Sequence, residues 1–161
     1  MCASIEDSGL GQAAATEAGL THRHPLAGDV AAAVTCLCRA LIRGASWSVA
    51  LGVAAADRSP ETRHALAIPT AGAVSRSGFA PDVLGAAVHF VDTSACFPDA
   101  LARAIDFAGP ANYCPVLVGS IGGARWGHAQ IEESSLHHQR DLLPRLKAAA
   151  RGLAGEWPEP R

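Results

Sequence analysis

Apolar side chains recur at steps of three and four residues along most of the chain. The longest such stripe runs from Leu26 to Leu41 and follows Pro25, and a second one runs from Pro81 to Val91. This spacing gathers the apolar side chains on one face of an α-helix, and a proline suits the first turn of a helix. The sequence therefore predicts helices over these two segments, with the stripe from Leu26 to Leu41 facing the core.

Capping residues and prolines mark the starts of further helices. Ser46 and Ser59 suit N-cap positions, and another apolar stripe begins at Phe97. A last helix is predicted at about residues 133–153, with a kink at Pro144. No Asn-Gly or Asp-Gly turn and no alternating strand pattern occurs in the sequence. These patterns predict an all-α domain, folded as a helical bundle of six or seven helices.

The two ends of the chain carry weaker patterns than the middle. Residues 1–20 are small and polar, so we expect either a poorly ordered lead-in or one weak helix there. Residues 21–155 make up the predicted domain, and residues 156–161 are expected to be a tail.

Composition and charge exclude several classes of protein. Hydrophobic residues make up 49% of the chain and charged residues 17%, which argues against overall disorder. The formal charge of −2 lacks the basic excess of a protein that coats nucleic acid. We see neither an uninterrupted apolar run of membrane-spanning length nor a secretory signal after Met1. We therefore expect a cytoplasmic protein without nucleic-acid or membrane partners.

An apolar segment with clustered glycines, Val116 to Gly127, raises the question of nucleotide binding. The dinucleotide fingerprint needs G-x-G-x-x-G after a strand, whereas the glycines here are Gly119, Gly122 and Gly123. Gly119 and Gly123 lie four residues apart on one helix face, which favours close packing against another helix. We therefore predict a buried helix, and we expect Gly123→Leu to destabilise it by overpacking.

Several motifs, in one consistent register, are shared with a known family. Thr21-His22-x-His24-Pro25 opens the long helix, and Phe97-x-x-Ala100-Leu101-x-x-Ala104-Ile105 follows later. The most specific segment, AIDFAGPANYCPVLVGSIGGARWG, keeps the family's register without a gap at Gly109, Gly119, Gly123, Ala124 and Gly127. From Thr21 to about Leu153 the chain resembles the C-terminal half of the ADP-ribosylglycohydrolase domain. The resemblance implies an all-α hydrolase that cleaves the glycosidic bond to ADP-ribose with two Mg²⁺ ions.

The same comparison shows a degenerate metal motif. The family holds its ions with a Thr-Asp-Asp cluster and an Asp-x-Asp-Thr cluster, but Pro110, Asn112 and Tyr113 stand at the Asp, Asp and Thr positions of the second cluster. Proline has no side-chain ligand, and the amide and the phenol are neutral, so two negative charges are lost. No Thr-Asp-Asp tripeptide occurs in the sequence. We expect neither a metal site nor a cofactor in this chain alone.

The resemblance also implies four candidate substrate contacts, which are Thr21, His22, Asn112 and Tyr113. Thr21 and His22 match a family motif close to the ADP-ribose pocket, although a Thr-based turn that caps the long helix explains them equally well. Asn112 and Tyr113 would contact a ligand where the metal lies in the family, or they reflect drift in a non-catalytic chain.

Three functions therefore stay open. The first is an ADP-ribosylglycohydrolase-like protein that is inactive as this chain alone, that is, a pseudoenzyme. The second is a non-catalytic module that binds ADP-ribose or a related nucleotide-sugar, or that associates with another subunit. The third is a truncated remnant. Because a half-domain would expose apolar surface, we expect a homo-oligomer or a partnership with a missing N-terminal half.

Overall fold

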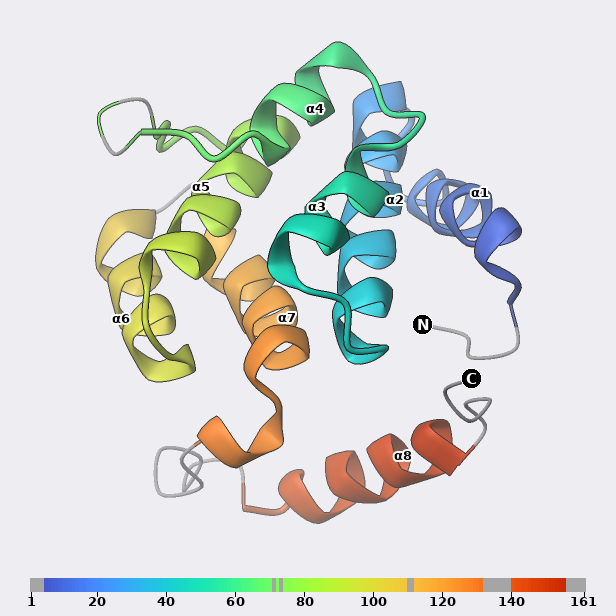
Figure 1. Ribbon diagram of the computed structural model, residues 1–161, viewed down its shortest axis with the longest axis vertical. Coiled ribbons are helices and arrows are strands. Elements are labelled where there is room, and N and C mark those ends of the chain that lie inside the picture. Colours follow the sequence, from blue (N-terminus) through green and yellow to red (C-terminus); the bar gives the residue numbers. More distant parts are fainter. Residues whose placement is uncertain (1–4, 71, 73, 110–111, 132–139, 156–161) are drawn as a thin grey trace.

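The computed structural model describes residues 5–70, 72, 74–109, 112–131 and 140–155, and all regular secondary structure in this part of the chain is helical. Its elements, in chain order, are α1 (Asp7–Ala18), α2 (Pro25–Ile42), α3 (Trp47–Ala55), α4 (Pro60–Leu66), α5 (Ala80–Thr93), α6 (Phe97–Ala108), α7 (Cys114–Trp126), the 3₁₀ turn η2 (His128–Gln130) and α8 (Leu143–Gly155). The all-α prediction is confirmed (Figure 1). The described residues contain eight α-helices rather than six or seven, because the segment at residues 1–20 includes α1.

Local signals set most of the helix starts. Ser46 accepts a hydrogen bond from the Val49 amide at 3.4 Å, and Ser59 accepts one from the Thr62 amide at 3.2 Å. These bonds satisfy amides of the first turn that have no partner inside the helix. The sequence prediction for both caps is therefore confirmed.

The predicted kink at Pro144 is wrong. Helix α8 begins at Leu143, so Pro144 lies in its first turn, where the missing amide hydrogen costs nothing. Residues 132–139, the first part of the predicted last helix, lie outside the described residues, as does the tail at 156–161.

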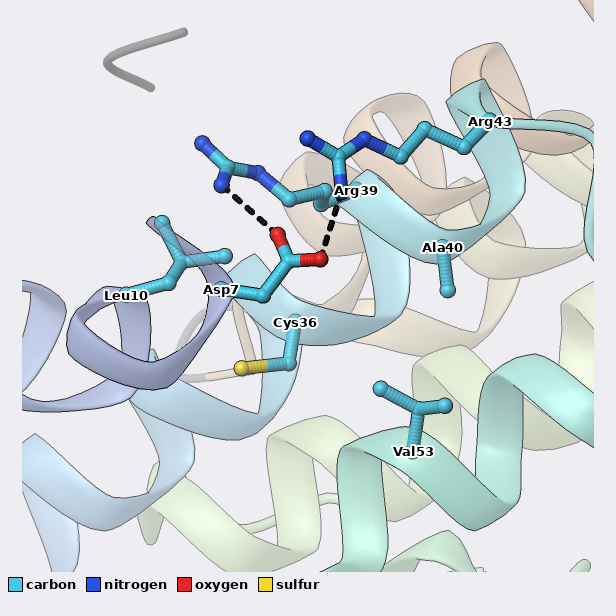
Figure 2. Close-up of a pocket in the computed structure, with 7 residues that line it drawn as sticks. All are labelled: Asp7, Leu10, Cys36, Arg39, Ala40, Arg43 and Val53. Atoms are coloured by element: carbon cyan, nitrogen blue, oxygen red, sulfur yellow. Dashed lines mark hydrogen bonds and ion pairs between the residues drawn. The ribbon is translucent and has the colours of Figure 1, made fainter. Parts of the chain in front are cut away.

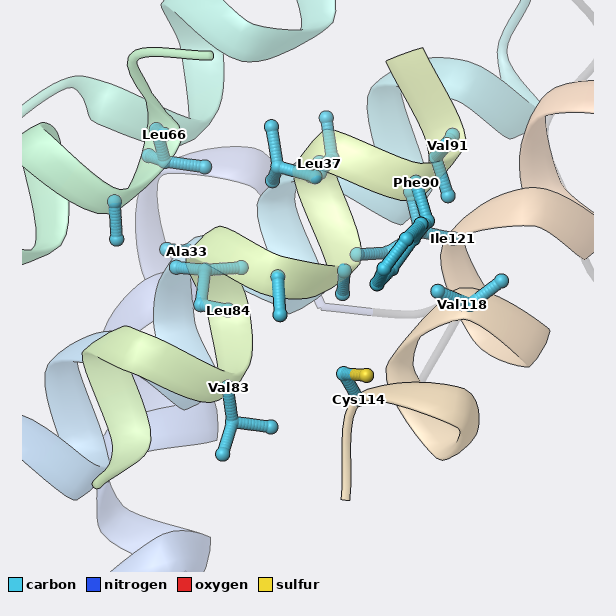
Figure 3. Packing of buried hydrophobic residues seen from close by; sticks show 14 of the residues in the cluster. Ala33, Leu37, Leu66, Val83, Leu84, Phe90, Val91, Cys114, Val118 and Ile121 are labelled. Atoms are coloured by element: carbon cyan, nitrogen blue, oxygen red, sulfur yellow. The ribbon is translucent and has the colours of Figure 1, made fainter. Parts of the chain in front are cut away.

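Helices α2, α5 and α7 supply most of the hydrophobic core (Figures 1 and 3). The predicted stripe of α2 is confirmed at Val30, Ala33, Leu37 and Leu41, which are all buried. Helix α5 is buried along almost its whole length, and α7 contributes a narrower set of core residues: Cys114, Val118, Ile121 and Gly122. The prediction of a buried α7 is therefore right for its inner face only, since Val116 on the other side is 65% exposed.

Helix α2 is also long and apolar enough to cross a membrane by length and composition, with 18 residues and a hydropathy of 1.5. The expectation from the sequence, which found no apolar run of spanning length, missed this helix. In the structure α2 packs against α1, α3, α4, α5 and α7, and its Arg39 side chain is buried at one end. Such packing is typical of a central core helix, which can be as long and as apolar as a membrane-spanning helix.

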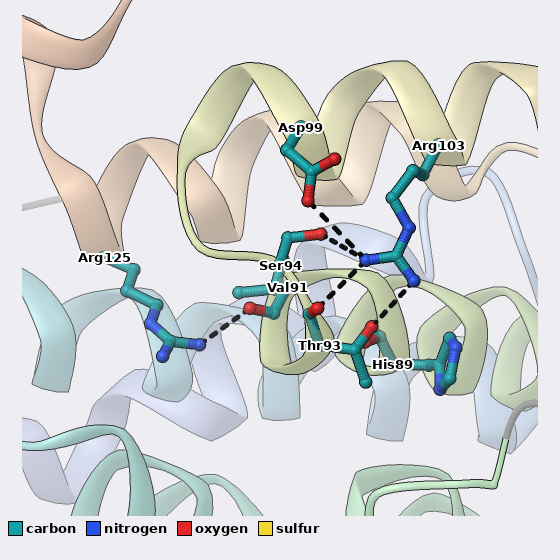
Figure 4. A network of polar contacts seen from close by, with 7 residues as sticks. All are labelled: His89, Val91, Thr93, Ser94, Asp99, Arg103 and Arg125. Carbon is teal, nitrogen blue, oxygen red and sulfur yellow. Dashed lines mark hydrogen bonds and ion pairs between the residues drawn. The ribbon is translucent and has the colours of Figure 1, made fainter.

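Two arginines from neighbouring helices donate hydrogen bonds to the carboxyl end of α5 (Figure 4). Arg103 of α6 donates to the Thr93 carbonyl at 3.0 Å and to the Ser94 hydroxyl at 2.7 Å. Arg125 of α7 donates to the Val91 carbonyl at 2.7 Å. The last carbonyls of a helix lack partners within it, so both cations stabilise the end of α5 and fix α6 and α7 beside it.

The glycine that allows close packing is not the one expected. A Cβ atom at Gly122 would lie 3.1 Å from the rings of Phe97 and Trp126, whereas a Cβ at Gly119 or Gly123 would meet no atom within 4 Å. Gly119 and Gly123 share a helix face as predicted, but that face points away from the core. The prediction that Gly123→Leu destabilises the helix by overpacking is therefore wrong, and that effect is expected of a leucine at position 122 instead.

Candidate functional site

Asn112, one of the predicted substrate contacts, is a buried structural clamp. Its side-chain Nδ2 donates to the carbonyl oxygens of Ser75 at 3.3 Å and Ser77 at 2.9 Å. Its Oδ1 accepts a hydrogen bond from the Cys114 amide at 2.8 Å. The side chain therefore joins the start of α7 to the segment that precedes α5, and only 4% of its surface is exposed.

This geometry allows only one orientation of the amide group. Two carbonyl oxygens require donors, and the Cys114 amide requires an acceptor, so the nitrogen and the oxygen of Asn112 cannot exchange places. All the hydrogens of the side-chain amide are engaged, and its oxygen faces the first turn of α7. The Asn112 oxygen thus serves as a structural hydrogen-bond acceptor at the start of α7.

Tyr113 lies in a different environment from its neighbour. It stands at the N-terminal boundary of α7 and is 68% exposed. Pro110, at the position of the first family aspartate, lies outside the described residues. The structure therefore leaves the Tyr113 ring accessible to a ligand while Asn112 is closed off.

Thr21 and His22, the other predicted pair, form the exposed turn between α1 and α2. The Thr21 hydroxyl donates to the Ala18 carbonyl at 3.4 Å and lies 2.9 Å from His22 Nδ1. The alternative of a threonine cap for the long helix is wrong, because His24 is the N-cap of α2 and accepts from the Leu26 amide at 3.3 Å. Thr21 instead helps to end α1.

The four predicted residues fall into two separate groups. Within the described residues, no hydrogen bond or ion pair links Thr21 or His22 to Asn112 or Tyr113. The first pair lies in the turn between α1 and α2, and the second lies at the start of α7.

A pocket does exist elsewhere, between α1, α2 and α3 (Figure 2). It has a volume of about 160 Å³ and is lined by Asp7, Leu10, Cys36, Arg39, Ala40, Arg43 and Val53. None of the four predicted contacts belongs to this lining. Sequence reasoning missed the pocket, because only the arginine spacing on α2 is visible in the sequence and its acidic partner lies more than 30 residues away.

The carboxylate of Asp7 bridges the two arginines of this pocket. Its oxygens lie 3.0 Å from Arg39 Nη1 and 2.5 Å from Arg43 Nη1, and Arg39 also donates to the Ile5 carbonyl at 2.6 Å. The hydrogen bond from Arg39 is the largest effect and lowers the pKa of Asp7. Desolvation opposes it, and the charge and hydrogen bond of Arg43 lower the pKa further. Burial raises the pKa of the Cys36 thiol, so the pocket favours a neutral cysteine over a reactive thiolate.

Replacing Asp7 with Asn is expected to lower the free energy of unfolding at neutral pH by at most about 1 kcal/mol, because the carboxylate is largely exposed and solvent screens the pair. A group whose folded pKa is lowered stabilises the protein above its unfolded pKa and loses this effect as pH falls. In urea titrations the difference from the wild type should therefore shrink as pH falls below the unfolded pKa of about 3.9, and vanish below the lowered folded pKa. Glu17→Gln on the same helix is the control, and a difference that persists in acid would contradict the bridge.

The described residues do not fit a magnesium site. Among them no group of three or more His, Cys, Asp or Glu side chains could hold a metal ion. At the family's ligand position, the Asn112 nitrogen faces two carbonyls and its oxygen is held by a backbone amide. Mg²⁺ requires several oxygen ligands that together carry negative charge, and Asn112 supplies no charge and only one oxygen, which already accepts a backbone hydrogen bond.

A family model described as ADP-ribosylglycohydrolase matches residues 4–161 of the chain. No curated protein and no solved structure matches the chain at a significant level. The family match extends beyond the resemblance at Thr21–Leu153 and takes in α1, so it covers essentially the whole chain. With the helical fold and the shared motifs around α7, this match shows that the chain belongs to the ADP-ribosylglycohydrolase family.

Proposed function

We propose that this chain is an ADP-ribosylglycohydrolase-like protein that does not hydrolyse ADP-ribose linkages by itself. The observation that carries the proposal is the clamp at Asn112, whose donors and acceptor are used by Ser75, Ser77 and Cys114. In the reaction that the family implies, carboxylates hold two divalent ions that activate the attacking water. Here the corresponding position instead fastens a loop to a helix.

The charge at this position supports the same proposal. A carboxylate at residue 112 would point its lone pairs at two carbonyl oxygens, so this loop geometry disfavours the ligand that the metal would need. Tyr113 carries no carboxylate, and its side chain is exposed to solvent rather than directed into a cluster of ligands. We propose that the chain carries no metal cofactor.

Binding of ADP-ribose or a related nucleotide-sugar is a weaker candidate. Thr21, His22 and Tyr113 are exposed and free to contact a ligand, but Asn112 is not, and the described pocket includes none of them. A cytoplasmic location and the absence of nucleic-acid partners remain proposals that rest on the composition and the formal charge of −2.

The second candidate function is that of a subunit-interaction module. Large apolar side chains on three consecutive helices are exposed: Ile105 on α6, Val116 on α7, and Leu146 and Leu153 on α8. A contiguous patch of exposed apolar side chains is typical of a surface that binds another chain.

We expect the purified chain to show no Mg²⁺ binding and no release of ADP-ribose from modified arginine or serine. The double variant Pro110→Asp/Tyr113→Thr should stay inactive, because it restores one carboxylate, keeps the clamp and still lacks a second cluster. Isothermal titration calorimetry with MgCl₂ measures Mg²⁺ binding, and an ADP-ribose release assay measures hydrolysis. An active family member is the positive control. Binding of two ions by the unmodified chain, together with turnover, would show that the active site lies elsewhere.

A further inference from the structure

Helix α8 carries a leucine face that the other described helices do not cover. Leu143, Leu146, Ala150 and Leu153 are spaced by three, four and three residues, which places them on one side of the helix. Leu146 is 62% exposed and Leu153 is 51% exposed. Figure 1 shows α8 lying off the bundle, beyond the end of α7, and among the described elements no extensive packing joins it to another helix.

The charge of α8 is opposite to that of the rest of the chain. The helix contains Arg145, Lys147 and Arg151 and no acidic residue. Residues 1–142 contain nine Lys/Arg against thirteen Asp/Glu, so their formal charge is −4. A basic amphipathic helix of this kind pairs with an apolar surface that has acidic side chains at its edge.

The paired helices α6 and α7 present an apolar surface with one exposed acidic side chain at its edge. They pack together where the Phe97 ring approaches Gly122, and each exposes a large apolar side chain, Ile105 at 58% and Val116 at 65%. On α6, Asp106 is exposed directly after Ile105.

The outer side of α7 also has room for another helix. A Cβ at Gly119 or Gly123 would meet no atom within 4 Å, and Val116 precedes them on the same side of α7. Small residues on a helix face let a neighbouring helix approach closely, so the leucines of α8 can pack there.

We propose that α8 of one copy docks across the outer face of α6 and α7 of a second copy, and that the second copy returns the same contact. Both surfaces are apolar, and the basic side chains of α8 would lie near Asp106 at the edge of α6. The exchange is reciprocal, so both copies use the same two surfaces and the assembly closes as a dimer. This inference rests on the second candidate function, and it does not depend on whether the chain hydrolyses ADP-ribose.

Sedimentation velocity of the full chain at micromolar concentration tests the proposal. We expect a dimer for the wild type. Leu146→Glu/Leu153→Glu on the helix, and separately Val116→Glu on the receiving face, should each weaken the dimer by more than about tenfold. Ala148→Glu/Gly152→Glu adds the same charge to exposed positions on the other side of α8, so this control should remain dimeric.

Circular dichroism shows whether each variant keeps its helices, and all four positions on α8 are exposed, so folding should persist. A monomeric wild type would overturn the proposal, whether α8 folds back on its own chain or stays undocked. The proposal would also be overturned if both Leu146→Glu/Leu153→Glu and Val116→Glu sediment as dimers like the wild type. Binding of a monomeric chain to phosphatidylglycerol vesicles through the leucine face would assign α8 to a lipid surface instead. These readouts are independent of the ADP-ribose release assay, so each proposal can fail separately.

Discussion

Asn112→Asp is expected to destabilise the folded chain by about 3 kcal/mol or more at neutral pH. The asparagine is 4% exposed and donates to the carbonyls of Ser75 and Ser77. A carboxylate at that place has no hydrogen to donate, and its charge would face two carbonyl oxygens inside the protein. The change is nearly isosteric, so loss of packing contributes little.

The destabilisation by Asn112→Asp should depend on pH in a defined direction. Burial and the two carbonyls favour the protonated acid, which can still donate one hydrogen bond, so the folded pKa of the new aspartic acid should lie above its unfolded value of about 3.9. A group with a raised folded pKa is most stabilising below its unfolded pKa, and that contribution is lost as pH rises through the folded pKa. The free energy of unfolding of the variant should therefore be close to that of the wild type in mild acid, and should fall below it as pH rises towards neutral.

Urea unfolding across this pH range measures the effect. Asn112→Ala should cost about 2 kcal/mol at every pH, because it leaves the same backbone groups without partners and adds no titrating group. Tyr113→Ala, at the exposed neighbouring position, should change stability by less than about 0.5 kcal/mol. A pH-independent effect of Asn112→Asp would show that the clamp does not hold the loop in solution.

Gly122→Leu is expected to lower the free energy of unfolding by about 2–3 kcal/mol. A Cβ there would lie 3.1 Å from both the Phe97 and the Trp126 ring, and the remaining atoms of leucine would have to displace these rings. Phe97 is buried between α6 and α7, so it cannot move away without opening the contact between the two helices. The higher helix propensity of leucine offsets only about 1 kcal/mol of this cost.

Gly123→Leu is the matched control on the same helix. No atom lies within 4 Å of its added Cβ, so stability should stay the same or rise by up to about 1 kcal/mol. Thermal and urea unfolding of both variants should be compared in the Leu146→Glu/Leu153→Glu background, where association cannot contribute. Equal destabilisation by the two substitutions would contradict the orientation of α7.

The helices of this chain were largely predictable from its sequence. Ser46 and Ser59 cap the helices that they were expected to cap, and the stripe from Leu26 to Leu41 faces the core as predicted. These features follow from contacts between residues three or four positions apart, which a sequence displays directly. The departure from the family's metal motif at Asn112 was also visible, because it needs only the residue types.

The role of each of these residues was decided by partners far away in the sequence. Asn112 was expected to be free for a ligand, but it bonds to carbonyls 35 and 37 residues away. Gly122, rather than Gly123, lies against Phe97 because α6 packs on that side of α7. Periodicity marks which residues share a helix face, but only the packing of whole helices determines which face becomes buried and which carbonyls a side chain meets. For that reason the helices and the missing carboxylates could be predicted from the sequence, whereas the contacts of Asn112 and Gly122 were decided by the tertiary structure alone.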